Sequence, residues 1–71
     1  MNALELTMLK TSDKRHLKNI VKSLKVASSR NIPLESLMSR VYALPLPAKV
    51  KAYVADLAER IYDDEIINLP F

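Results

Sequence analysis

The sequence contains no glycine, no cysteine and no tryptophan, and only one histidine among its 71 residues. Without cysteine the chain has neither disulfides nor thiolate metal ligands, and His16 has no second imidazole with which to share a zinc ion. Without glycine it has no phosphate-cradling loop. No apolar run approaches the roughly 18 residues of a membrane span, and residues 1–10 lack the pattern of a signal peptide. We therefore expect a cytoplasmic protein that binds no metal and no cofactor.

Catalytic chemistry also has few candidates. His16 lies within DKRHLK, and the sequence places no nucleophile or oxyanion donor beside it, so we expect an exposed helical residue. Asp56, Glu59, Asp63 and Asp64 lack the glycine turn and alternating oxygens of a calcium loop, which favours a solvated acidic face. We predict a protein that is not an enzyme and has no small-molecule substrate.

Length and periodicity indicate one small helical domain spanning residues 1–71. A chain of this length buries only about 60% of the surface that its unfolded form exposes, so its stability depends on tight helix packing or on a partner. β-branched residues never cluster in alternation, whereas apolar residues recur at helical spacing throughout. The pattern predicts an all-α three-helix bundle with helices at about 12–30, 33–44 and 47–64 and antiparallel neighbours.

Polar residues and prolines predict the helix boundaries. Thr11 or Ser12 is expected to cap the first helix, and Asn31 to take the left-handed conformation after it. Pro33 and Pro47 suit the first turns of the second and third helices, because their missing N–H groups cost nothing there. The predicted inward faces are Leu17, Ile20, Val21, Leu24, Ala27 and Ser28; Leu34, Leu37, Met38 and Val41; and Val50, Tyr53, Val54, Leu57, Ala58 and Ile61.

The two ends of the chain are too apolar for ordinary solvated tails. Residues 1–10 carry three leucines and a second methionine, and residues 66–71 read IINLPF. Such segments either close over the open ends of the bundle or form part of a binding surface. We expect closure, because a core this small needs all its apolar residues.

Charge is unevenly distributed along the chain. Residues 1–51 hold ten Lys and Arg against three Asp and Glu, a net charge of +7, whereas residues 52–71 have a net charge of −4. Lys14, Lys18, Lys22 and Lys25 form a ridge on the first helix, with Arg15 alongside. This ridge either contacts phosphates or solvates the outer face of the helix. No aromatic residue is interleaved among the lysines, so the sequence does not suggest stacking on single strands.

The segment VASSRNIPLESLMSRVYAL resembles the helix-turn-helix of sigma-factor region four. Ala27 takes the small position where the helices touch, Asn31 replaces the turn glycine, and Ile32 and Leu37 fill buried positions. The resemblance implies a DNA-binding regulator whose second helix contacts DNA. The implied recognition residues there are Glu35, Ser36, Met38 and Ser39, and Arg40 of the same helix is a further predicted nucleic-acid contact.

Most of the chain also resembles the theta subunit of bacterial DNA polymerase III and its phage homologue. The residues that carry this resemblance are the corner 30–33 (RNIP), the third-helix opening with Pro47, Val50, Lys51 and Tyr53, and the closing 69–71 (LPF). Val54 stands where that family has an aromatic residue, and the second-helix region is about a turn longer here. The resemblance implies a non-catalytic three-helix protein of DNA replication that binds and stabilises an epsilon-type proofreading exonuclease.

The resemblance does not itself assign interface residues. Tyr53 and Tyr62 are the predicted anchors, because amphipathic aromatic side chains often anchor interfaces, and Leu69 and Phe71 of the apolar end are predicted to join them. A theta-like accessory subunit is thus the first hypothesis. The alternatives are a small helix-turn-helix regulator and a phage or plasmid inhibitor of a host protein.

Overall fold

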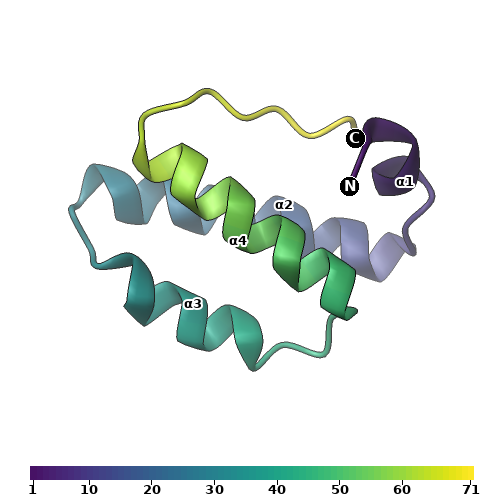
Figure 1. The fold of residues 1–71 in the computed structure, drawn as a ribbon, viewed down its shortest axis with the longest axis horizontal. Coiled ribbons are helices and arrows are strands. Elements are labelled where there is room, and N and C mark those ends of the chain that lie inside the picture. Colours follow the sequence, from purple (N-terminus) through teal and green to yellow (C-terminus); the bar gives the residue numbers. More distant parts are fainter.

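The computed structural model describes all 71 residues and is entirely helical, with no strand. Its helices are α1 (Ala3–Thr7), α2 (Thr11–Ser29), α3 (Leu34–Tyr42) and α4 (Ala48–Tyr62). The three longer helices each contact the other two, and α2 and α4 form the most extensive pair (Figure 1). The predicted all-α class is confirmed. α1 was not predicted, since the sequence indicated only an apolar segment there.

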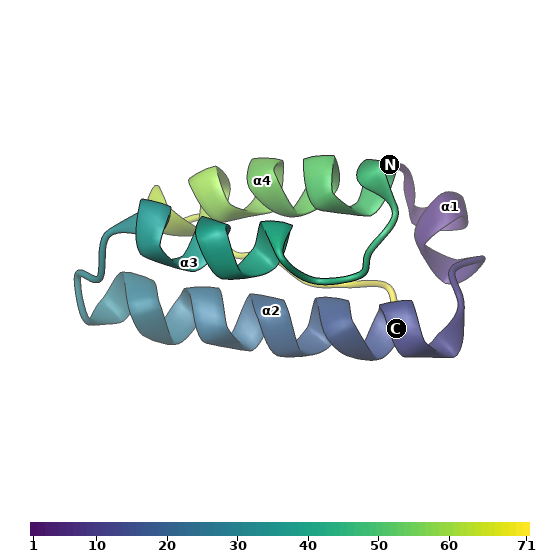
Figure 2. The same ribbon diagram turned by 90° about the horizontal axis from the view of Figure 1, so that it is seen from below.

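The α2–α4 pair is flanked on opposite sides by α3 and by the end of the chain. After α4 the backbone is extended and runs back along the pair, finishing beside α1 (Figure 1). The perpendicular view shows α3 in front of the pair and this extended segment behind it (Figure 2). We call residues 65–71 the C-terminal segment.

The hydrophobic core is built mainly by α2 and α4. Their predicted inward faces are confirmed, except that Ser28 and Tyr53 are only half-buried. The predicted apolar face of α3 also turns inward, but only Val41 is fully buried; Leu34, Leu37 and Met38 are half-buried and pack against the core. The core cluster consists of Leu6, Leu17, Ile20, Val21, Leu24, Val41, Leu46, Val50, Val54, Leu57, Ala58, Ile61 and Ile67.

α2 ends in a Schellman motif, which satisfies its last carbonyl groups without glycine. Asn31 has a φ of 57°, as predicted. The N–H of Ile32 donates to the carbonyl of Ala27 over 3.0 Å, and the N–H of Asn31 donates to that of Ser28 over 3.2 Å. This pair of bonds defines the motif. The chain thereby turns sharply enough for α3 to pack back on α2.

α4 ends in the same way two residues before its predicted end. Asp64 has a φ of 64°, and the N–H groups of Glu65 and Asp64 donate to the carbonyls of Arg60 and Ile61, both over 3.0 Å. Asp63 and Asp64 therefore lie beyond the helix. Negative charge is disfavoured at the C-terminal end of a helix, so these two carboxylates oppose a continuation of α4.

Two further boundary predictions need correction. α2 begins at Thr11 itself, so Thr11 and Ser12 lie inside its first turn, and the N-cap is Lys10, which makes no side-chain capping bond. The only side-chain N-cap is in α1. There the amide N–H of Glu5 donates to Oδ1 of Asn2 over 2.8 Å, and Oε1 of Glu5 accepts from the amide N–H of Asn2 over 3.4 Å, a reciprocal capping box.

The prolines at the starts of α3 and α4 lie just outside these helices, and not in their first turns as predicted. Pro33 and Pro47 are the N-cap residues, with extended ψ angles of 133° and 148°. α3 ends at Tyr42, two residues before the predicted end. A residue before proline is disfavoured in the helical region, so the chain leaves the helix ahead of Pro45.

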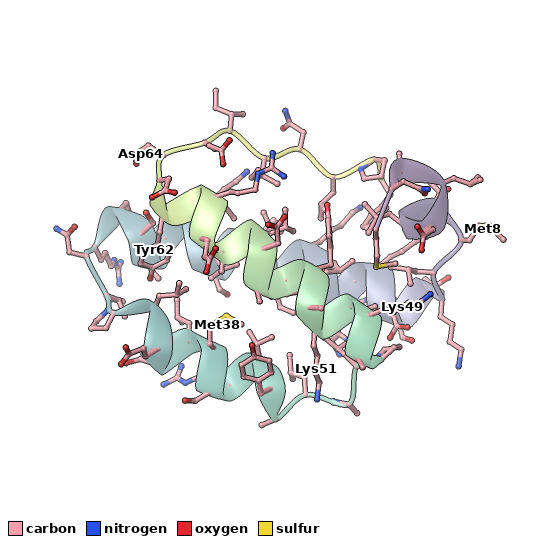
Figure 3. All side chains as sticks on the ribbon, viewed as in Figure 1. Met8, Met38, Lys49, Lys51, Tyr62 and Asp64 are labelled. Carbon is pink, nitrogen blue, oxygen red and sulfur yellow. The ribbon has the colours of Figure 1, made fainter.

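The apolar ends divide between the core and the surface. Leu6 and Ile67 are buried, and Met1, Leu9, Leu69 and Phe71 pack against the core. By contrast, Leu4, Met8 and Ile66 are exposed, and the side chain of Met8 points away from the molecule (Figure 3). Each end thus contributes packing while leaving apolar atoms in solvent.

Replacing Asp64 by glycine should raise the free energy of unfolding by about 0.5–1 kcal/mol. Glycine adopts a positive φ without the Cβ strain that aspartate carries, and this gain exceeds its entropic cost in the unfolded chain. Asp63→Gly is the matched control, because it removes the same charge at a residue whose φ is −88°. Thermal melts should show a gain for Asp64→Gly and none for Asp63→Gly; equal shifts would attribute the effect to charge.

Candidate functional site

The basic ridge of α2 lies beside the C-terminal segment. Nζ of Lys25 donates a hydrogen bond to the carbonyl of Ile67 over 3.2 Å. At the other end of the ridge, Nζ of Lys14 and Nζ of Lys18 lie 5.8 Å and 6.0 Å from the centroid of the Phe71 ring. Both ends of the ridge thus contact the C-terminal segment. Lys22 lies between these contacts along the helix and is exposed.

Phe71 brings an aromatic ring to lysines that had none in the sequence. Together with Thr11 and Arg15, these three side chains line a hollow of about 200 Å³. The sequence did not suggest stacking at the ridge, because no aromatic residue lies among the lysines along the chain. Phe71 joins Lys14 and Lys18 only because the C-terminal segment runs back along α2, and helical periodicity carries no signal for that path.

The four residues predicted to bind a partner do not form one surface. Tyr62, at the end of α4 nearest the α2–α3 corner (Figure 3), donates its hydroxyl to the carbonyl of Ile32 over 2.6 Å. Leu69 and Phe71 pack against the core from the other side of the α2–α4 pair. Tyr53 borders a hollow with Met1 near α1. All four pack against the hydrophobic core, and Tyr62 also bonds to the α2–α3 corner.

Tyr53 has a pKa above the ordinary tyrosine value of 10.0. Burial is the main cause, since it disfavours the phenolate; Arg60 lowers the pKa and Asp56 raises it. The unfolded chain therefore loses this proton at lower pH than the folded chain. It follows that the contribution of Tyr53 to stability is present below pH 10 and decreases as pH rises above it.

Tyr62→Phe should lower the free energy of unfolding by about 1 kcal/mol. The substitution removes the hydroxyl that satisfies the part-buried carbonyl of Ile32, and an unpaired buried acceptor is costly. Tyr42→Phe is the control, because Tyr42 is exposed and its hydroxyl makes no hydrogen bond. Urea denaturation should separate the two variants; equal midpoints would mean that the Tyr62 bond contributes nothing.

An apolar groove runs between α2 and α3. One part is a hollow of about 170 Å³, and a second hollow continues it, since both share Ser23 and Leu37. We call this surface the α2–α3 groove. Its lining residues are Ile20, Lys22, Ser23, Leu24, Val26, Ala27, Ile32, Leu37, Arg40, Val41 and Leu44.

The groove exists because α3 contributes only one fully buried side chain. Leu37 and Leu44 are half-buried, and Val26 on the facing helix is exposed. The sequence predicted Leu37 as core and assigned no role to Val26 or Leu44. Val26 was nevertheless detectable, because it is an apolar residue outside the periodic inward face of α2.

The α3 residues that were predicted to contact DNA have different environments in the structure. Ser36 and Ser39 are exposed, and Oγ of Ser39 donates back to the carbonyl of Glu35 over 3.1 Å. Arg40 lies on the edge of the α2–α3 groove. The ridge lysines that approach the C-terminal segment lie on the other flank of α2, so the structure does not gather the predicted contacts on one face.

Ion pairs are confined to one region of the molecule. Arg60 lies 3.9 Å from Asp56 and 3.2 Å from Glu65, and no cation of α2 or α3 has a carboxylate within 4.0 Å. His16 is half-buried rather than exposed as expected, and its Nδ1 is buried without a hydrogen-bond partner. Helical spacing places it one turn before Ile20, on the flank of α2 that borders the groove.

The acidic and histidine side chains are dispersed. No three of them gather in a group that could hold a metal ion. No helix is both long enough and apolar enough to cross a membrane. Among the hollows of the surface, the α2–α3 groove is the most apolar and the hollow at Phe71 gathers the most cations.

Comparison with known proteins returned no match among protein-family models, curated proteins or solved structures.

Proposed function

We infer that this chain is a non-catalytic, cytoplasmic accessory protein of DNA replication that binds and stabilises an epsilon-type proofreading exonuclease, as theta subunits do. The observation that carries the proposal is the α2–α3 groove. It leaves Leu37, Leu44 and Val26 partly or largely exposed after the fold is complete. In a domain this small, side chains that could still be buried favour a function in binding a protein.

The chemistry of the groove favours an acidic partner surface. Its floor is apolar, its edges carry Lys22 and Arg40, and no carboxylate of the chain pairs with either cation. An apolar ridge flanked by Asp or Glu would bury its centre on the floor and place its charges on the edges. This arrangement of an apolar centre within a polar rim is typical of protein interfaces.

The positions shared with theta subunits have architectural roles that fit the proposal. Ile32 lies in the α2–α3 corner and accepts the Tyr62 hydrogen bond, Pro47 is the N-cap of α4, and Phe71 packs against the core. We therefore describe the fold as a three-helix bundle closed by its apolar ends, with α3 presenting the binding surface. Under this proposal the positions shared with theta subunits maintain the fold, and the α2–α3 groove contacts the exonuclease.

Binding to a purified epsilon-type exonuclease tests this function. Calorimetric titration should give a complex, and the exonuclease should melt at a higher temperature when the chain is present. Lys22→Glu and Arg40→Glu should each weaken binding by about tenfold, which corresponds to 1.4 kcal/mol. Both residues are exposed, so neither substitution should unfold the chain.

Lys49→Glu is the matched control, because Lys49 is an exposed lysine on α4 outside the groove (Figure 3). It should bind as the unmodified chain does. No complex with the exonuclease would refute the theta-like function. Equal losses for all three variants would show that net charge, and not the groove, determines binding. Capture of another protein through the groove would favour the inhibitor alternative.

A further inference from the structure

The hollow at Phe71 combines an aromatic ring with several cations. Lys14, Arg15 and Lys18 lie within two turns near the start of α2, and Phe71 reaches them from the C-terminal segment. We call these four residues the basic–aromatic cup. The cup lies on the opposite side of the α2–α4 pair from α3, so it is separate from the α2–α3 groove.

The cations of the cup are available to a ligand. None has a carboxylate within 4.0 Å, since both ion pairs of the molecule belong to Arg60. The two lysine–ring distances of 5.8 Å and 6.0 Å lie at the outer limit of a cation–π contact, where the interaction is weak. Both ammonium groups can therefore turn from the ring to an anion at little cost.

The dimensions of the cup restrict its ligand. A hollow of about 200 Å³ is smaller than the 300–1,000 Å³ typical of drug-sized pockets. A hollow of this size accommodates one planar group of a ligand on the Phe71 ring, with anionic groups of the same ligand beside the surrounding cations. Lys22, one turn beyond Lys18, belongs to the edge of the α2–α3 groove, so the cations of the cup are Lys14, Arg15 and Lys18 alone.

We propose that the basic–aromatic cup binds single-stranded nucleic acid, with one base stacked on Phe71 and the adjacent phosphates on Lys14, Arg15 and Lys18. Stacking on an aromatic side chain accepts any base, and lysine and arginine side chains hold the backbone without reading its sequence. Duplex nucleic acid stacks its bases internally, so it offers the cup only phosphates. The proposal goes beyond exonuclease binding and does not depend on it.

Fluorescence anisotropy with a labelled dT12 oligonucleotide tests the proposal. The logarithm of the binding constant should fall with the logarithm of salt concentration with a slope of about −2, as expected for three phosphate contacts on a single strand. The corresponding duplex should bind more weakly. Phe71→Leu should weaken single-strand binding about fivefold or more, because leucine keeps the packing but removes the ring face. Phe71→Trp should restore it.

Charge variants complete the test. Lys14→Ala combined with Lys18→Ala should weaken binding and reduce the steepness of the salt slope by about 1.4. Arg30→Ala combined with Lys49→Ala removes the same charge at exposed residues outside the cup and should leave the slope unchanged. No dT12 binding at low salt overturns the proposal. Tighter duplex binding, or equal binding by Phe71→Leu, also overturns it, and the former favours the helix-turn-helix alternative.

Discussion

Leu24→Ala and Leu57→Ala should each lower the free energy of unfolding by about 2–5 kcal/mol. Both leucines are 1% exposed, and they come from the two helices that form most of the core. Alanine removes their buried atoms and leaves a cavity that the surrounding helices fill only partly. A domain of this length has a total stability of roughly 4–11 kcal/mol, so either substitution is expected to bring the chain close to unfolding.

Urea denaturation monitored by circular dichroism measures this effect, because the midpoint and slope of the unfolding transition together give the free energy of unfolding. Leu4→Ala is the control, because Leu4 is 69% exposed and its substitution should change stability by less than about 0.5 kcal/mol. Midpoints unchanged by Leu24→Ala and Leu57→Ala would show that the inward faces of α2 and α4 are assigned wrongly.

Ile67→Ala should lower the free energy of unfolding by about 2–4 kcal/mol, although Ile67 lies outside every helix. It is 5% exposed within the core cluster, and its carbonyl accepts the hydrogen bond from Lys25. Loss of its side chain removes buried apolar contacts at the point where the C-terminal segment joins the core. Cooperative loss of α2 and α4 should follow at lower urea concentration.

Ile66→Ala is a closely matched control, since Ile66 is the same residue type, one position earlier, and 87% exposed. Its midpoint should stay within about 0.5 kcal/mol of the unmodified chain. Equal effects for the two isoleucines would mean that the C-terminal segment does not pack as described. Such a result would also remove Phe71 from the basic–aromatic cup.

Helical periodicity was sufficient to predict α2 and α4. Their apolar residues repeat at i, i+3 and i+4 over four to five turns, so a misplacement of one residue changes little. Asn31 was predictable as a left-handed residue because a chain without glycine has few other candidates after a helix. Pro33 and Pro47 located the following helices to within one residue.

α1 and the degree of burial of α3 were not predicted. A five-residue helix has too few residues for periodicity, but Asn2 and Glu5 have the spacing of a capping box, which was a usable signal. In α3 the apolar spacing predicts which face turns inward. It does not predict how deeply that face is buried, because depth depends on the path of the chain through Asn31 and Pro45.

The candidate sites depend on contacts between distant parts of the chain. The α2–α3 groove requires the position of α3 against α2, and the basic–aromatic cup requires Phe71 to return to the start of α2. Neither arrangement has a local pattern in the sequence. The lysine ridge was predictable as a row of cations on one helix. Which of these lysines contact the C-terminal segment and which face only solvent was not predictable.

Mapping amide chemical shifts during titration with an epsilon-type exonuclease tests the central claim most directly. Binding through the α2–α3 groove predicts the largest shifts at Ser23, Leu37 and Arg40, and small shifts in the C-terminal segment. No shifts at stoichiometric exonuclease, or shifts confined to the C-terminal segment, would contradict the claim that this protein binds its partner through the groove.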